Sequence, residues 1–209
     1  MTANSETMQY LLEPKAVAVI RKVDRTKVIQ VIEALIEGGI TGIEITLDSD
    51  DALGVIKEAK EKFAGRAGVG AGTVLNAKEA EAAIDAGADF VFAPILDKET
   101  IEVTKRHGKI SIPGVFTPTE MQQAYEWGAD MVKVFPASVV GAQFVKDVQG
   151  PLGHIPIIVT GGINVNNFKD FLKAGAVAVG VGGSLLNKEY IANGEFHKIT
   201  ELAIQYTGV

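Results

Sequence analysis

Eight short apolar runs recur along the chain, separated by longer amphipathic segments. The runs span residues 16–21, 42–47, 67–73, 89–94, 110–115, 131–136, 156–161 and 176–181. They begin roughly 20–26 residues apart, which is the length of one strand, one helix and two turns. Between the first two runs, Val28, Ile32 and Leu35 recur at helical spacing before a Gly38-Gly39 stop. Strands that are apolar on both faces indicate a parallel sheet covered by helices.

Eight such units predict a (β/α)8 barrel, an α/β fold, over a single domain of residues 1–209. Residues 2–12 predict an extra helix before the first strand. Glycines just before four of the runs predict helix C-caps, at Gly39, Gly87, Gly128 and Gly175. The alternative is an open doubly wound sheet, which rarely needs eight evenly spaced units.

Composition limits the partners that the chain could have. Its 209 residues are 47% hydrophobic, which suits one large core. The net charge of −6, without a basic block, argues against nucleic-acid or anionic-membrane partners. There is no cysteine, the first residues do not resemble a signal peptide, and no apolar run approaches the ~20 residues of a membrane span. We therefore expect a cytoplasmic protein.

Lys133 stands inside an apolar strand-like run, between Met131 and Phe135 on the same strand face. In a barrel this face points inward, and the chemistry lies at the carboxyl ends of the strands. A lysine that snorkels out at a strand end is the plainer reading. Inside a barrel, however, desolvation favours the neutral amine, which can attack a carbonyl and form a Schiff base.

Glu44 is the second ionisable group that strand alternation aims into the barrel, in the run "GIEITL". It could simply form a structural ion pair with Lys133. An amine beside a carboxylate proton carrier is also the minimum for imine and enamine chemistry. Arg21, at the end of the first run, could hold a substrate carboxylate, tune Glu44, or be a surface arginine.

Glycine-rich strand ends supply candidate binding residues. Thr73 follows "GVGAG", where the backbone would be open to a substrate, whereas Pro94 more often marks a turn. After the last two strands, "TGGI" and "GVGGSLL" would present backbone amides to a phosphate, with a short helix opening at the second turn. The residues concerned are Gly161, Gly162, Gly182, Gly183 and Ser184. The alternative is that these segments are only tight turns.

A metal site has little support in the sequence. His107 and His154 precede strands, at the opposite end of the barrel, and His197 lies in the last helix. Glu44 and Asp48 are the only obvious carboxylates near the strand ends, so a weak Mg²⁺ alternative survives. We expect no metal and no cofactor.

Six motifs occur in the order and at the spacing typical of one enzyme family. They are "IEITL", "VGAGTVLN", "PGVFTPTE", "VKVFPA", "TGGI" and "GVGGSLL". Over about residues 8–207 the chain resembles 2-keto-3-deoxy-6-phosphogluconate (KDPG) aldolase, whose family also covers 4-hydroxy-2-oxoglutarate (KHG) aldolase activity. The resemblance implies a metal-independent class I aldolase, typically a homotrimer, that releases pyruvate and, from a phosphorylated substrate, glyceraldehyde 3-phosphate.

The resemblance also implies roles for individual residues. Lys133 resembles the Schiff-base lysine, and Glu44 the acid/base glutamate for carbinolamine dehydration and proton transfer at carbon. Thr73 resembles part of the pyruvate-carboxylate pocket, which Phe135 and Pro94 would line. The residues that match the phosphate and distal-hydroxyl end are Thr160, Gly161, Gly162, Gly183 and Ser184.

Asp48 departs from the family pattern, because many members have arginine after "E-x-T-L" to grip the substrate carboxylate. Either Arg21 fills that role, or Asp48 pairs with Arg21 and holds it away while Thr73 and the adjoining backbone bind. Two rival functions remain open at this point. One is a sugar-phosphate epimerase or Mg²⁺-dependent synthase that uses Glu44 and Asp48, and the other is a non-catalytic phosphosugar-binding protein.

Overall fold

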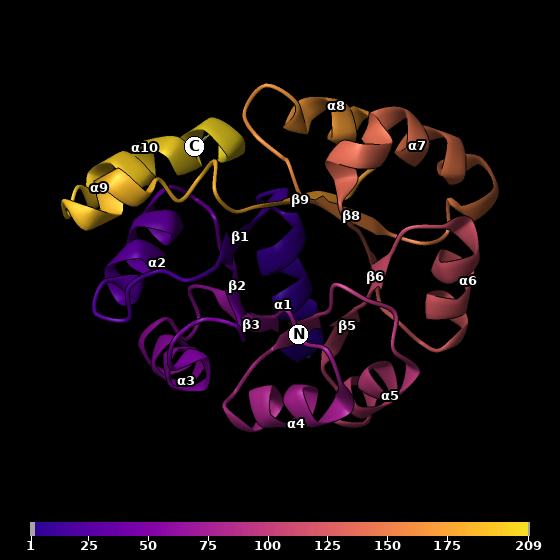
Figure 1. Ribbon diagram of the computed structural model, residues 1–209, viewed down its shortest axis with the longest axis horizontal. Helices are drawn as coiled ribbons and strands as arrows, with labels where there is room; N and C mark the ends of the chain where they lie inside the picture. Colours follow the sequence, from indigo (N-terminus) through magenta and orange to yellow (C-terminus); the bar gives the residue numbers. More distant parts are fainter. Residues whose placement is uncertain (1–2, 209) are drawn as a thin grey trace.

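The computed structural model describes residues 3–208, which form a ring of parallel strands surrounded by helices (Figure 1). The strands are β1 (Ala16–Ile20), β2 (Gly42–Thr46), β3 (Gly68–Gly72), β4 (Phe90–Phe92), β5 (Ile110–Ile112), β6 (Gly114–Val115), β7 (Val132–Val134), β8 (Ile157–Thr160) and β9 (Ala178–Val181). The helices are α1 (Ala3–Leu12), α2 (Val28–Glu37), α3 (Ala52–Lys62), α4 (Ala77–Asp85), α5 (Lys98–Arg106), α6 (Pro118–Glu126), α7 (Ala137–Leu152), α8 (Phe168–Lys173), α9 (Lys188–Ala192) and α10 (Phe196–Thr207). The predicted (β/α)8 barrel with an N-terminal helix is therefore confirmed; Thr2, at the start of that helix, lies outside the described residues.

Pro113 divides the fifth predicted run into two strands. The sheet order is β5-β4-β3-β2-β1-β9-β8-β7-β6, so β5 pairs with β4 at one end and β6 pairs with β7 at the other. Proline has no N–H to donate, but its carbonyl still accepts a bond from the Lys133 amide at 2.8 Å. One continuous segment thus joins both ends of the sheet and closes the barrel around eight strand positions.

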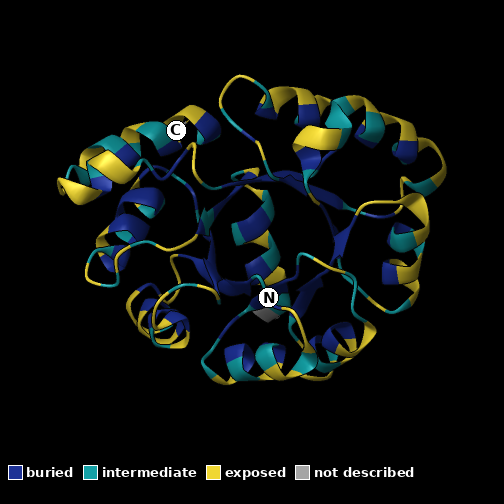
Figure 2. Cartoon of the chain, viewed as in Figure 1, coloured by how far each residue is buried: buried dark blue, intermediate teal, exposed yellow. Residues whose placement is uncertain are grey.

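Alternate strand residues build two separate cores. Figure 2 shows the strands almost wholly buried and the helices buried on the face toward them. The outward cluster packs against the surrounding helices and includes Ile43, Ile45, Val132 and Val134. The inward cluster consists of Leu11, Val17, Phe90, Phe92, Ile110, Ile112, Met131, Ile158 and Ala178. Because Leu11 belongs to α1, which lies behind the strands near the barrel centre in Figure 1, this helix plugs the amino end.

The predicted glycine turns return the chain from helix to strand. Gly39, Gly87, Gly128 and Gly175 have φ between 86° and 110°, a left-handed conformation that favours glycine over other residues. Each turn starts a strand at the amino end of the barrel, so every strand delivers its carboxyl end to the same opening. Among residues 3–208, no helix has the length and apolar character needed to cross a membrane.

Candidate active site

Lys133 lies inside the barrel, as strand alternation predicted. It sits in the middle of β7 with only 5% of its surface exposed. Its Nζ lies 5.2 Å from the ring centroid of Phe92 and 5.5 Å from that of Phe135, both within the range of cation–π contact. The ammonium group is therefore held between two aromatic faces at the carboxyl end of the barrel.

Glu44 faces Lys133 from β2 and is completely buried. Its Oε1 lies 3.7 Å from Lys133 Nζ, close enough for an ion pair but too long for a hydrogen bond. Among the described residues, neither carboxylate oxygen has a hydrogen-bond partner. Burial raises the pKa of Glu44 above its ordinary value of 4.5, and the charges of Lys133 and Arg21 oppose that rise only in part. A buried carboxyl group that has a raised pKa and no hydrogen-bond partner is suited to move protons.

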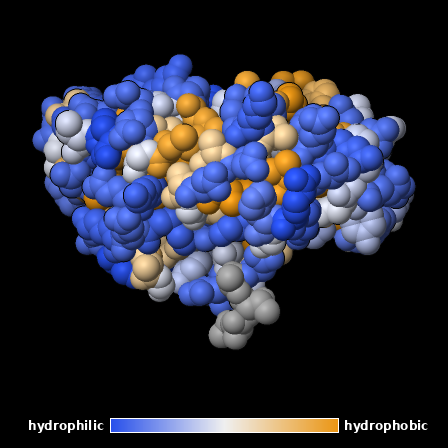
Figure 3. All heavy atoms as spheres, turned by 90° about the horizontal axis from the view of Figure 1, so that it is seen from below, coloured by the Kyte–Doolittle hydropathy of each residue, from blue (hydrophilic) through white to orange (hydrophobic). Residues whose placement is uncertain are grey.

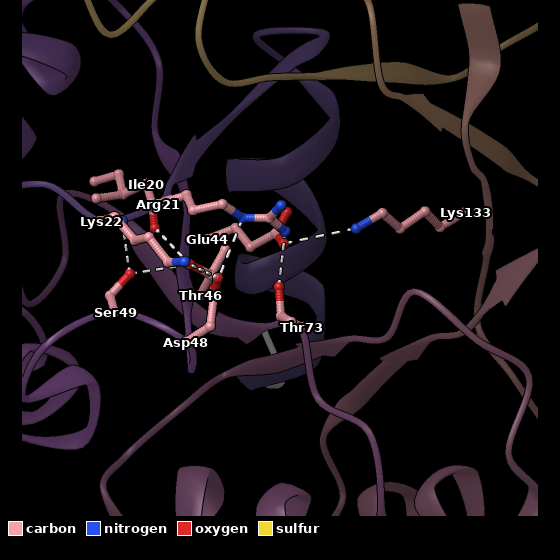
Figure 4. Close-up of polar contacts among 9 residues, drawn as sticks. All are labelled: Ile20, Arg21, Lys22, Glu44, Thr46, Asp48, Ser49, Thr73 and Lys133. Atoms are coloured by element: carbon pink, nitrogen blue, oxygen red, sulfur yellow. Dashed lines mark hydrogen bonds and ion pairs between the residues drawn. The ribbon is translucent and has the colours of Figure 1, made fainter. Parts of the chain in front are cut away.

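Arg21 contacts both Thr73 and Asp48, the two residues on which the alternatives for carboxylate binding depend (Figure 4). Its Nη2 donates to Thr73 Oγ1 at 2.9 Å, and its Nε lies 3.7 Å from Asp48 Oδ1. Arg21 is thus half exposed and paired with Asp48, and it lines the same cavity as Lys133.

That cavity, called here the main cavity, has a volume of about 770 Å³. Nine of the predicted site residues line it: Arg21, Lys133, Phe135, Thr160, Gly161, Gly162, Gly182, Gly183 and Ser184. Thr160 is 4% exposed, and its hydroxyl has no partner among the described residues, so it can bond a ligand. A ligand in the main cavity could contact Lys133 at one end and the glycine turns at the other.

Three predicted site residues do not line the main cavity. Glu44 is sealed behind Lys133, and Thr73 lines a neighbouring cavity of about 500 Å³. Pro94 follows β4, and its carbonyl packs so closely on Gly114 that a side chain at Gly114 would collide with it. Thr73 is nevertheless connected to the main cavity, because its hydroxyl accepts a hydrogen bond from Arg21, which lines that cavity.

The two glycine turns differ in detail from the prediction. The Ser184 hydroxyl donates to the Ile163 carbonyl at 2.7 Å and lies 3.3 Å from Tyr206 Oη, so it ties the two turns together. The expected helix at the second turn is a single turn in which Leu185 and Leu186 donate to the Gly182 carbonyl; α9 begins only at Lys188. Backbone amides, rather than a helix terminus or the serine hydroxyl, are the donors that this end of the cavity can offer.

Several cationic residues of the main cavity were not foreseen. Lys22, Lys27 and Lys188 also line it, and Lys27 Nζ donates to the Ala192 carbonyl at 2.7 Å. These lysines follow the first and last strands, and that position was the only signal in the sequence. With Arg21 and Lys133 they give the cavity five cationic side chains against one carboxylate, that of Asp24.

No cluster of three histidine, aspartate or glutamate side chains lies close enough to hold a metal ion within residues 3–208. His107 ends α5 and His154 follows α7, both at the amino end of the barrel as expected. The two carboxylates of the magnesium alternative also face different partners, because Glu44 faces Lys133 and Asp48 faces Arg21 and Lys22.

Comparison with known proteins agrees with this arrangement. Residues 8–202 match the family model described as KDPG and KHG aldolase. The chain belongs to this family. It is 31% identical to the KHG/KDPG aldolase of Escherichia coli K12 over 90% of this chain and 87% of that protein.

Solved structures place the fold in the same aldolase family. A KDPG aldolase from Legionella pneumophila, solved with pyruvate captured as a covalent carbinolamine, has a TM-score of 0.88 at 26% identity and covers 99% of this chain and 98% of that chain. A designed cube-shaped cage, made by fusing symmetric oligomeric domains, matches with a TM-score of 0.85 at 26% identity, over 91% of this chain and 70% of its own. The chain therefore shares its barrel fold with a KDPG aldolase of known structure.

Proposed function

We propose that this aldolase cleaves phosphorylated 2-keto-4-hydroxy acids of the KDPG type to pyruvate and glyceraldehyde 3-phosphate, and 4-hydroxy-2-oxoglutarate to pyruvate and glyoxylate. One observation carries the proposal: the Lys133 amine and the Glu44 carboxyl, which has no hydrogen-bond partner among the described residues, face each other inside the barrel, 3.7 Å apart. The main cavity leads from this pair to the glycine turns. Its five cationic side chains suit a substrate with a carboxylate and a phosphate.

The first half of the reaction builds the imine. The neutral Lys133 amine attacks the C2 carbonyl of the substrate and gives a carbinolamine. Protonated Glu44 donates a proton to the departing hydroxyl, water leaves, and a protonated imine remains. The raised pKa of Glu44 keeps more of this group in the acid form that the step requires.

The second half breaks the carbon–carbon bond. A base removes the proton from the C4 hydroxyl, C3–C4 breaks, and the electron pair moves through C3 to the imine nitrogen as an enamine forms. The aldehyde leaves, C3 takes a proton from the acid/base group, and water hydrolyses the imine to release pyruvate. Glu44, next to Lys133, is the group that we assign to proton transfer at C3.

The remaining site residues bind the two ends of the substrate. We assign Arg21 and Thr73 to the carboxylate end, with Phe135 and Pro94 beside it, and Thr160 to the hydroxyls of the chain. We assign the distal phosphate to the amides of the glycine turns. The residues of these turns are Gly161, Gly162, Gly182, Gly183 and Ser184.

We further infer a metal-independent cytoplasmic enzyme that assembles as a homotrimer. The family resemblance supports the trimer, and exposed apolar side chains support an interface between copies of the chain. Six exposed apolar side chains follow successive strands around the barrel opening: Leu53, Leu75, Ile95, Phe116, Val139 and Val165. Figure 3, seen from the side of α4, also shows hydrophobic residues exposed among polar ones on this face. Light scattering should then give three times the chain mass of 22.1 kDa.

Reductive trapping tests the mechanism directly. Incubation with pyruvate and cyanoborohydride should leave a stable adduct on Lys133, located by peptide mass spectrometry, and cleavage should survive EDTA. Lys188→Met is the comparison variant for the adduct measurement. It removes an exposed lysine of the cavity and keeps Lys133, so the adduct on Lys133 should still form. An absence of adduct on Lys133, or an activity that EDTA abolishes and Mg²⁺ restores, would favour the epimerase or synthase. Binding of the phosphorylated substrate without turnover would favour the non-catalytic protein.

A further inference from the structure

The loops after β1 and β2 are fastened to each other next to the active site. Thr46 Oγ1 lies 3.2 Å from the Ile20 carbonyl, to which it donates, and 3.0 Å from Ser49 Oγ. The Lys22 amide donates to the same Ser49 hydroxyl at 2.8 Å. Figure 4 shows this chain of contacts running beside the Arg21 side chain. The two loops therefore hold Arg21 and Asp48 in a fixed relation to each other.

Asp48 lies between two cations. It is 3.7 Å from Arg21 Nε and 3.6 Å from Lys22 Nζ. Partial burial disfavours its carboxylate, but nearby hydrogen bonding and the charges of Arg21 and Lys22 outweigh burial and lower the pKa of Asp48. Asp48 is therefore ionised at neutral pH, and its charge is matched rather than free to repel a substrate carboxylate.

The Arg21–Thr73 hydrogen bond fixes the direction of the Thr73 hydroxyl. A guanidinium group has donors only, so Thr73 Oγ1 must accept in this 2.9 Å bond. The hydroxyl proton of Thr73 then points elsewhere and is available to another acceptor. A substrate carboxylate bound beside Lys133 would be such an acceptor, and it would also meet the cationic edge of Arg21.

Thr73 is also strained in a way that requires support. Its φ is 57°, in the left-handed region that a β-branched residue rarely adopts. Such strain persists only where the surroundings over-determine the conformation, and it is concentrated at functional sites. The strand before it ends in Gly72, and the bond from Arg21 comes from two strands away, so distant parts of the barrel opening define where this hydroxyl lies.

We propose that Asp48 is a positioning residue for carboxylate recognition: it holds Arg21 against Thr73, so that the Thr73 hydroxyl and the Arg21 guanidinium together bind the carboxylate of the pyruvate half of the substrate. The inference rests on the proposed function, since it presumes that a keto acid binds at Lys133. It combines parts of both sequence-based alternatives, because Arg21 takes the anchoring role while it is paired with Asp48. The aspartate after "EITL" then serves carboxylate binding indirectly, because it positions Arg21, and its presence does not mean that the carboxylate site is lost.

Two carbonyl compounds separate carboxylate recognition from imine formation. Pyruvate and acetone can both form an imine on Lys133, but only pyruvate carries a carboxylate. The measurement is the rate of cyanoborohydride trapping as a function of each compound's concentration, with the adduct on the Lys133 peptide quantified by peptide mass spectrometry. The ratio of the two second-order rate constants reports carboxylate recognition alone.

Thr73→Val should lower this ratio by about ten- to a hundredfold, the typical loss for a hydrogen bond to an ionised group. Asp48→Asn should lower it by about two- to fivefold, because a partly exposed ion pair contributes less. If Asp48 acts through Arg21 and Thr73, the Thr73→Val/Asp48→Asn double variant should fall no further than Thr73→Val alone. Asp50→Asn is the matched control, since it removes an exposed carboxylate from the same loop.

The outcomes are distinguishable. A ratio that Asp48→Asn changes no more than Asp50→Asn does, or effects of Asp48→Asn and Thr73→Val that add fully, would overturn the positioning role while leaving the aldolase proposal intact. A wild-type protein that traps neither compound on Lys133 would overturn both. An increased ratio in Asp48→Asn would mean that Asp48 restrains Arg21, the reverse of the role proposed here.

Discussion

Gly72 on β3 leaves the space that the Glu44 side chain of β2 occupies. The two strands pair with Glu44 opposite Gly70 and Thr46 opposite Gly72, and the Glu44 side chain reaches along the sheet toward Gly72. A methyl group at Gly72 would overlap Glu44 Oε1 and crowd its Cγ and Cδ at 2.5 and 2.6 Å. Gly72, the second glycine of "GAGT", is therefore needed for the Glu44 side chain to fit beside Lys133.

Gly72→Ala should consequently displace Glu44 and lower both kcat and thermal stability. Overpacking of a core typically costs about 1–3 kcal/mol of unfolding free energy. Because the collision is with the Glu44 side chain, Gly72→Ala should cost much less stability in a Glu44→Ala background, although activity would stay low. A double-mutant cycle by thermal and urea unfolding checks this, and additive costs in the two backgrounds would show that Gly72 is confined by something else.

Lys133→Met should reduce aldol cleavage to the uncatalysed background while the barrel remains folded. Methionine is apolar, flexible and of similar length, so it can fill the space between the Phe92 and Phe135 rings. Glu44, left without its cation, can take up a proton because burial already raises its pKa. Coupled detection of pyruvate measures the activity, and Lys169→Met, at an exposed position on α8, serves as control. Turnover that survives in Lys133→Met would exclude the imine mechanism.

Glu44 should set the acidic limb of proton exchange at the methyl group of pyruvate. Abstraction of that proton requires the carboxylate, so the rate should fall as pH falls through the pKa of Glu44, and this limb should lie above 4.5 because the pKa is raised. Proton NMR in deuterium oxide measures the exchange. Glu44→Gln should lower the rate by about 10²–10⁴-fold and remove the limb. Arg21→Gln should move the limb to higher pH, because the Arg21 charge lowers the Glu44 pKa. A limb that stays at the same pH in Glu44→Gln would assign it to another group.

Strand alternation was sufficient to predict that Lys133 and Glu44 point into the barrel. A barrel strand has one face toward the helices, so the valines beside Lys133 and the isoleucines beside Glu44 fixed which way each charge points. The distance between the two could not be predicted, because it depends on strands β2 and β7 meeting across the barrel interior. The division of the fifth run at Pro113 was also missed, although proline's missing N–H is its cause.

The surroundings of the pair depend on contacts between distant segments. The Ser184 hydroxyl is turned by the Ile163 carbonyl and Tyr206, which lie 21 and 22 residues away in sequence. Lys27 reaches the cavity rim because it bonds to Ala192, 165 residues further on. No local pattern encodes such contacts, since they follow from the packing of loops on a closed barrel.

Gly183→Ala tests the phosphate end without disturbing the fold. A Cβ at Gly183 would meet nothing within 4 Å, and its φ lies outside the left-handed region, so alanine should fit at no cost to stability. The added methyl would instead project into the space where we place the phosphate and would weaken the bond from the backbone amides. A lost hydrogen bond to a charged group corresponds to about a ten- to hundredfold rise in KM for KDPG.

The unphosphorylated substrate supplies the comparison for this variant. 4-Hydroxy-2-oxoglutarate lacks the phosphate, so its kcat/KM should change less than about twofold in Gly183→Ala, an effect within the range expected for a neutral surface substitution. Gly162→Ala is a useful contrast, because its φ of 75° and its approach to Ser138 predict lost stability as well as lost binding. Steady-state kinetics with both substrates, together with melting temperatures of both variants, give the result. An equal loss on the two substrates in Gly183→Ala would mean that this turn shapes the whole cavity and that the phosphate is bound elsewhere, with Lys27 and Lys188 the next residues to substitute.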